Sequence, residues 1–145
     1  MGRGVSQKFR CRADTVPRVR AVVGEELRRN GINGDLFDRL VLASAEACNN
    51  AILHSDSTSY DVSIDIDKDE CTVTVSDSGA GFEVPDEMEM PAPDSLSQRG
   101  LALMCVLVDD VEVTSDENGT TVVLRQALDT NHRHSNGHDA VAPIS

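Results

Sequence analysis

Glu46 and Asn50 are the two polar side chains with the clearest chemical potential, because they lie in a stretch that is mostly apolar. Residues 36–53 contain no Gly or Pro and are rich in Leu and Ala, which predicts a helix that is apolar nearly all round and therefore buried. Positions i and i+4 point the same way. A buried polar group without a partner costs about 1–3 kcal/mol. We therefore expect Glu46 and Asn50 to face a ligand that carries metal and phosphate.

A second motif, Asp77 with Gly79 and Gly81, follows directly on a predicted strand. A carboxylate at the end of a strand can accept a hydrogen bond from the exocyclic amino group of a purine, and glycines beside it let the backbone pass close to the ring. A strand that ends in Asp-Ser-Gly is more often a plain turn. Taken alone, the motif is compatible with both interpretations.

Two further places could complete a nucleotide site. Arg99 and Gly100 follow a long loop and open a short predicted helix, where free N–H groups, a glycine and a guanidinium suit a phosphate. Thr121, in a predicted hairpin, could supply a hydroxyl to the ring pocket. Each place also has a plainer interpretation: an ordinary helix start, and β-branched residues that open a strand.

The elements that must position these residues form one α+β domain over residues 1–128, followed by a polar tail over residues 129–145 that we expect to be disordered. Hairpin strands with grouped helices predict a two-layer arrangement, with a mixed, mostly antiparallel sheet covered on one face by helices. Residues 83–98 show no clear period, which predicts a long loop of the kind that is usually functional or mobile, and we call it the lid. The predicted strands are 6–12, 60–66, 71–75, 111–114 and 120–125, and the predicted helices are 16–29, 33–54 and 101–107.

The charge is uneven along the chain. The net charge is −12, yet residues 1–20 hold six Lys and Arg residues against Asp14 alone. The rest of the chain, which we call the acidic body, therefore carries a strong negative charge and repels nucleic acid. The basic segment 1–20 could bind an acidic protein, fold back on the chain's own acidic surface, or be a solvated face. The four cysteines are scattered without a C-x-x-C pair, and no apolar run approaches a membrane span. We therefore expect a reduced, cytoplasmic protein without a membrane segment.

The order of the motifs carries more information than any one of them. E-x-x-x-N-A-x-x-H, then D-x-G-x-G after a strand, then R-G-x-A after the lid, then G-T-T together resemble the nucleotide pocket of the GHKL ATPase superfamily, whose ATP-binding module is the Bergerat fold. The resemblance covers residues 6–126. The short single-domain layout is similar to that of the bacterial anti-sigma-factor serine/threonine kinases.

This resemblance implies roles for individual residues. Asn50 would hold Mg²⁺ through its side-chain oxygen, and Glu46 would polarise the attacking hydroxyl of a serine or threonine in a partner. Asp77 would read the adenine, while His54 matches the end of the helix motif and has a structural role. The other pocket residues that the resemblance implies are Gly79, Gly81 and Thr121 around the adenine, and Arg99, Gly100, Leu101 and Ala102 at the phosphates.

The resemblance also implies a function: a homodimer, built around the N-terminal strand and first helix, that binds a sigma factor and uses Mg-ATP to phosphorylate a STAS-type anti-anti-sigma protein. Arg20 is either a contact for an acidic patch on the sigma factor or a solvated arginine. Ala102 replaces the second glycine that is usual in its motif, and the lid is acidic, which favours ATP binding over fast transfer. The alternative is therefore a non-catalytic module that binds ATP or sequesters the sigma factor.

Two other functions fit less well. A histidine sensor kinase needs a phospho-accepting histidine on a long helical hairpin, which residues 1–35 do not contain. Three histidines in the tail could bind a transition metal, although such residues in an Asn/Ser/Gly segment more often do nothing. They are His132, His134 and His138.

Overall fold

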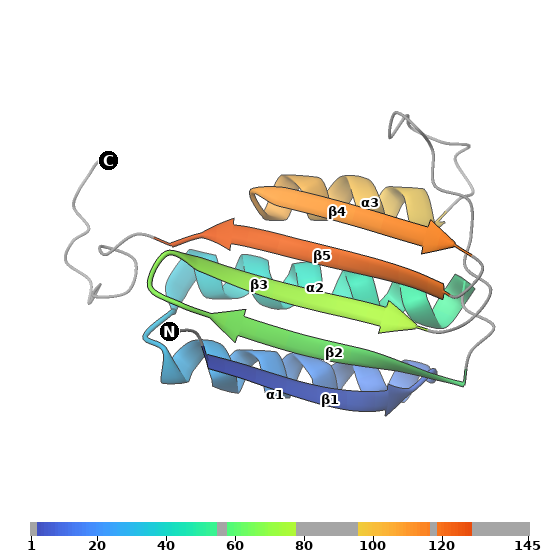
Figure 1. The fold of residues 1–145 in the computed structure, drawn as a ribbon, viewed down its shortest axis with the longest axis horizontal. Coiled ribbons are helices and arrows are strands. Elements are labelled where there is room, and N and C mark those ends of the chain that lie inside the picture. Colours follow the sequence, from blue (N-terminus) through green and yellow to red (C-terminus); the bar gives the residue numbers. More distant parts are fainter. Residues whose placement is uncertain (1–2, 55–57, 78–95, 117–118, 129–145) are drawn as a thin grey trace.

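A computed structural model of the chain describes residues 3–54, 58–77, 96–116 and 119–128. Five strands form one sheet in the order β1-β2-β3-β5-β4, and the helices cover one of its faces (Figure 1). The elements are β1 (Arg3–Arg10), the 3-10 turn η1 (Ala13–Thr15), α1 (Val16–Arg29), α2 (Gly34–His54), β2 (Ser59–Ile66), β3 (Glu70–Asp77), α3 (Leu96–Leu107), β4 (Asp110–Asp116) and β5 (Gly119–Ala127). The predicted α+β, two-layer fold is confirmed.

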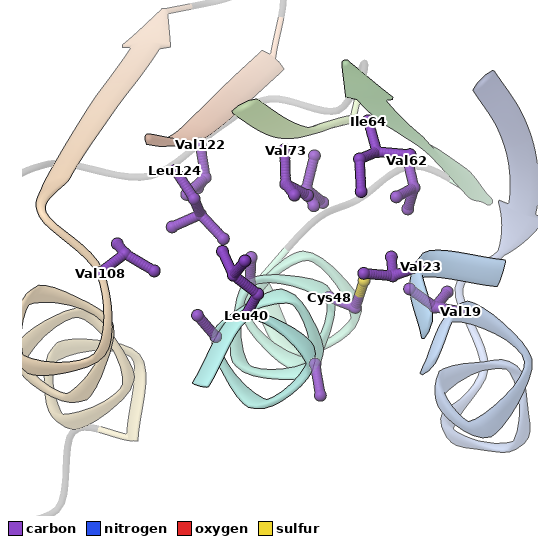
Figure 2. Packing of buried hydrophobic residues seen from close by; sticks show 14 of the residues in the cluster. Val19, Val23, Leu40, Cys48, Val62, Ile64, Val73, Val108, Val122 and Leu124 are labelled. Atoms are coloured by element: carbon purple, nitrogen blue, oxygen red, sulfur yellow. The ribbon is translucent and has the colours of Figure 1, made fainter. Parts of the chain in front are cut away.

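Every strand pairing within the described residues is antiparallel, so the sheet is not mixed. Along most of β2 and β3, buried side chains alternate with half-buried or exposed ones, as expected for a sheet that is covered on one side. Figure 2 shows Val73, Val122 and Leu124 projecting from the sheet toward the helices. The core is therefore built from aliphatic side chains that the strands and helices share.

Helix α2 lies between α1 and α3, with Leu40 and Cys48 beneath the sheet (Figure 2). Its burial is less complete than the sequence predicts, because Leu42 and Leu53 remain 38% and 56% exposed. In a two-layer fold the side of the middle helix that faces away from the sheet has no third layer to cover it. The polar residue Ser44 is fully buried and donates its hydroxyl to the Leu40 carbonyl at 2.8 Å.

Most of the predicted strand bounds differ from the observed ones by one or two residues, and two elements differ by more. Strand β1 begins earlier and ends at Arg10, and α3 begins at Leu96 rather than at Leu101. Gly100 therefore lies inside α3. The far end of α3 is fixed to α2 by Arg39, which donates from Nη1 to the Leu107 carbonyl at 2.9 Å.

Several sequence predictions fall outside the described residues. They are the pocket glycines Gly79 and Gly81, most of the lid, and the tail with its three histidines. None of the helices in the described ranges is long and apolar enough to span a membrane.

Candidate nucleotide-binding site

Asn50 is the most unusual side chain of α2. It is 4% exposed, and its Nδ2 finds no hydrogen-bond partner in the part of the chain that the structure describes. A buried amide donor left in this state costs about 1–3 kcal/mol, so such groups usually serve a ligand or a water molecule. Glu46, one turn earlier, is half-buried. The two residues together give α2 one polar face inside the protein.

Gly100 of α3 lies directly over this polar face. A Cβ atom added at Gly100 would stand 3.4 Å from both Asn50 Nδ2 and Glu46 Oε1, and 3.5 Å from Asn50 Oδ1. The backbone of α3 therefore comes within van der Waals reach of both side chains, and only a glycine leaves the intervening space open. Three residues that the sequence analysis selected from two distant motifs are thus brought together.

The other residues of the α3 motif have different surroundings. Leu101 is 1% exposed and belongs to the hydrophobic core, so its contribution is to hold α3 in place. Ala102 is half-buried. The side chains of Arg99 and His54 lie outside the described part of the structure.

Asp77 ends β3, and the strand register decides which residues share its face of the sheet. It pairs with Tyr60 of β2 and with Thr120 of β5, whereas Thr121 pairs with Ser76. Because paired residues of an antiparallel sheet lie on the same face and successive residues alternate, Thr120 lies on the helix-covered face with Asp77. Thr121 lies on the other face. This corrects the prediction that Thr121 supports Asp77: Thr120, buried and one residue earlier, holds that place.

The motifs converge on one end of the molecule. Figure 1 shows the end of β3, the end of α2 and the start of α3 at the same end of the sheet. Asp77 ends β3, and Glu46 and Asn50 lie in the second half of α2, so these residues belong to elements that meet at this end. That is the arrangement expected for one nucleotide that lies across both.

Tyr60, which pairs with Asp77 in the sheet, is a polar residue that the sequence motifs do not indicate. Tyr60 is fully buried, and its hydroxyl lies 2.7 Å from Thr15 Oγ1, which in turn contacts the Arg12 carbonyl oxygen at 2.8 Å. Burial raises the pKa of Tyr60 to about 12, so it stays neutral. Tyr60 is the one tyrosine of the chain and opens the strand after the central helix, a signal that could have drawn attention to it.

Cys11 was also missed. Burial raises the pKa of its thiol, and the negative charge of Asp77 raises it further. The thiol therefore lies within electrostatic reach of the carboxylate at the candidate adenine end, although the two residues are far apart in the sequence. The signal for this proximity is the strand order, since β1 and β3 flank β2.

A metal ion at this site would depend on the ligand. In the described ranges no group of three or more His, Cys, Asp or Glu residues could hold an ion. Mg²⁺ is typically held by one or two protein oxygens together with phosphate oxygens and waters. Asn50 alone, beside phosphate, suits such an ion.

Comparison with known proteins decides the family. The family model described as the histidine kinase-like ATPase domain matches residues 9–126. The chain belongs to this family. Its description names an ATPase, so ATP is the expected nucleotide, and the resemblance found in the motifs is confirmed.

Similar proteins include serine-protein kinases called RsbW. The one from Bacillus velezensis is 30% identical over 137 residues, and that from Bacillus licheniformis is 28% identical over 138 residues; each alignment covers 86% of this chain and 85% of the relative. The anti-sigma F factor of Clostridium perfringens is 32% identical over 98 residues, which cover 61% of this chain and 70% of that protein. These names agree with the function expected from the motifs.

Solved structures support the fold. The RsbU and RsbW domains of a Mycobacterium tuberculosis protein match 86% of this chain with a TM-score of 0.63 at 21% identity. This chain spans 32% of that longer chain. The Acinetobacter baumannii histidine kinase AdeS matches 87% of this chain and 68% of its own with a TM-score of 0.54 at 13% identity.

Proposed function

We propose that this chain is an anti-sigma factor that binds a sigma factor and uses Mg-ATP to phosphorylate a serine or threonine of an anti-anti-sigma protein. The family and the names of the relatives support this function. The observation that carries it is the Asn50 amide, buried beside Glu46 under the backbone of Gly100 with its Nδ2 unsatisfied by the described residues.

These residues fit a metal-bound triphosphate. Asn50 Oδ1 would bind Mg²⁺, and Asn50 Nδ2 would donate its unused hydrogen bond to a phosphate oxygen. Mg²⁺, when bound, supplies positive charge that offsets the charge developing during phosphoryl transfer. Gly100 keeps the phosphate path open, and Arg99 is proposed to add a guanidinium beside it.

Glu46 is the proposed catalytic residue. Its carboxylate lies one turn from Asn50 and can accept the proton of a serine hydroxyl that attacks the terminal phosphate. Asp77 would accept a hydrogen bond from the adenine amino group, with Thr120 beside it on the same face. Gly79 and Gly81 would shape the ring pocket.

The partners follow from the same proposal. A sigma factor acts on RNA polymerase, so its regulator would work in the cytoplasm, and the anti-anti-sigma substrate would be of the STAS type. A homodimer is part of the proposal, as the resemblance implies. The acidic body of the chain repels nucleic acid, so the proposal includes no direct contact with it.

Transfer of labelled phosphate tests the proposal. ATP labelled on the terminal phosphate is mixed with the protein and purified anti-anti-sigma proteins of the same organism. We expect label on one of them with the natural protein and with Asp38→Asn, which changes an exposed carboxylate of the same helix to an amide. We expect none with Glu46→Gln, although ATP still binds. Equal labelling by Glu46→Gln would contradict the role of Glu46.

A binding module without phosphoryl transfer is the second candidate, and one observation favours it. Residues 83–98 hold five acidic residues and no Lys or Arg, which gives little help to a triphosphate. In the same experiment this candidate predicts a complex with the partner and no label on it. That result would be compatible with the proposed ATP site and would contradict the proposed kinase activity.

A further inference from the structure

A small pocket lies where α1 ends and α2 begins, at the opposite end of the sheet from the end of β3 (Figure 1). Its volume is about 280 Å³. We call it the turn pocket, and its lining residues are Arg28, Gly31, Ile32, Asn33, Gly34 and Phe37. None of them belongs to the candidate nucleotide site. β1 and the start of α1, around which the proposed homodimer is built, contribute no lining residue either.

The chain reversal that forms the turn pocket is held by its own hydrogen bonds. The Gly31 N–H donates to the Arg28 carbonyl at 3.0 Å. The Ile32 N–H donates to the Leu27 carbonyl at the same distance. Gly31 and Gly34 have φ angles of 78° and 70°, where a side chain would be strained. A pocket whose walls are fixed before binding loses less entropy when a ligand enters.

The walls of the turn pocket are mainly apolar. Ile32 is fully buried, and Phe37 is half-buried. The Phe37 ring lies close against α1, since a Cβ atom added at Gly24 would stand only 3.1 Å from its Cζ atom. A Cβ atom added at Gly34 would meet nothing within 4 Å. The pocket therefore combines an apolar surface with open space beside Gly34.

Arg28 supplies a positive charge at this apolar surface. Its guanidinium carbon lies 4.8 Å from the centroid of the Phe37 ring, so the cation is held over the aromatic face. Arg28 is exposed and has no acidic partner among the residues that the structure describes. Because it stacks on a residue of α2, its side chain belongs to the α1–α2 connection.

Two acidic side chains of the adjoining turns already have partners. Glu26 pairs with Arg29 at 3.6 Å, and Asp35 pairs with Arg39 at 2.9 Å. Arg28 therefore keeps an unneutralised charge, on a chain whose net charge is −12. The first turn of α2 adds the positive end of a helix dipole on the same side. The electrostatics of the turn pocket favour an anion.

These properties select the class of ligand. A carboxylate accepts charge-assisted hydrogen bonds from a guanidinium group, often two at once. An apolar group attached to that carboxylate would gain from covering the Phe37 ring. A cation is repelled by Arg28. A nucleotide is too large, because the volume lies at or below the lower end of the usual range for ligand pockets, about 300–1,000 Å³.

We propose that the turn pocket binds a small organic carboxylate with an apolar body, its carboxylate on Arg28 and its apolar body against Phe37. A free acid and the C-terminal residue of a peptide share this chemistry. The inference does not depend on the proposed kinase function, because the two sites lie at opposite ends of the sheet.

Titration with 3-phenylpropionate tests the proposal. Binding to the full chain, labelled with ¹⁵N, is followed through the backbone amide signals. We expect saturable shifts within residues 28–37, and binding at least about tenfold weaker for 3-phenylpropanamide, which keeps the ring but lacks the charge. The peptide Gly-Gly-Phe and its C-terminal amide form the second pair of probes. The carboxylate probe that binds more tightly, free acid or peptide, identifies the source of the ligand.

Substitutions locate the site. Arg28→Gln removes the charge of an exposed side chain and is expected to weaken binding by about tenfold or more. Asn33→Asp should also weaken it, because the new carboxylate repels that of the ligand. Arg20→Gln removes an exposed arginine earlier on the same helix, so it is the matched control and should leave binding within about twofold.

Four results would overturn the proposal. They are the absence of saturable binding by both carboxylate probes, equal binding of the amide probes, equal weakening by Arg20→Gln, and competition between 3-phenylpropionate and ATP. Competition would place the acid in the candidate nucleotide site instead. ATP affinity is therefore measured with and without the acid on the same samples, and we expect the two values to agree within about twofold.

Discussion

Gly100→Ala should separate the stability of the fold from the binding of ATP. The added methyl group would stand 3.4 Å from Asn50 Nδ2 and from Glu46 Oε1, which is an ordinary van der Waals distance. The folded protein can therefore accept it without moving either side chain. The methyl group nevertheless occupies the space between the α3 backbone and the polar face of α2.

The two expected effects have opposite signs. Alanine inside a helix is more favourable than glycine by about 0.5–1 kcal/mol, so the free energy of unfolding should rise or stay within about 1 kcal/mol of the natural value. ATP should bind at least about tenfold more weakly, which corresponds to about 1.4 kcal/mol, because its phosphates can no longer approach the backbone.

Urea denaturation and calorimetric titration of ATP measure the two quantities. Gly24→Ala is the matched control, because Gly24 is also helical and its added methyl would meet the Phe37 ring at 3.1 Å, away from the site. We expect that control to keep its ATP affinity. The reasoning would be refuted if Gly100→Ala bound ATP as tightly as the natural protein does, or if this variant failed to fold.

Other residues give predictions of the same kind. Asn50→Leu should raise the free energy of unfolding by about 1–2 kcal/mol, because it removes a buried unsatisfied donor, and should abolish ATP binding; lower stability on urea denaturation would contradict this. Burial raises the pKa of Cys48 and Cys71 from 9.0 to about 12. Between about pH 9 and 12 these thiols stay protonated in the folded chain but ionise in the unfolded chain. The free energy of unfolding should therefore fall by up to about 1.4 kcal/mol per pH unit for each thiol. A free energy of unfolding that does not change over this pH range would argue against their burial. Asp77→Asn should lower the pKa of Cys11, so iodoacetamide should alkylate Cys11 faster near pH 8.5, as followed by mass spectrometry. An unchanged rate of alkylation would show that the Asp77 charge does not act on the Cys11 thiol.

The long periodic elements were predictable because their patterns are unambiguous. The predicted helix over residues 16–29 matches α1 at both ends, since Pro17 at its start and Asn30 at its end are local signals. The start of α3 was predicted five residues late. A glycine usually marks a helix boundary, whereas Gly100 lies inside α3, where its missing side chain admits Asn50 and Glu46.

The candidate site was predictable in part. The spacing of Glu46 and Asn50 fixes their common face, and Gly100 joins them because α3 packs on α2. The choice between Thr120 and Thr121 depends on strand register, which local sequence does not fix when both residues are threonine. The proximity of Cys11 and Tyr60 to Asp77 depends on strand order, so only the assembled sheet reveals it.

Calorimetric titration of ATP, with and without Mg²⁺, into the natural protein and Asp77→Asn tests the central claim most directly. Asp65→Asn, an exposed carboxylate of β2, serves as the control. We predict that the natural protein and the control bind ATP more tightly with Mg²⁺. Asp77→Asn should bind at least about tenfold more weakly, in line with roughly 1.5–3 kcal/mol for a hydrogen bond to a charged group. Equal affinity in all three proteins would contradict an adenine pocket at Asp77.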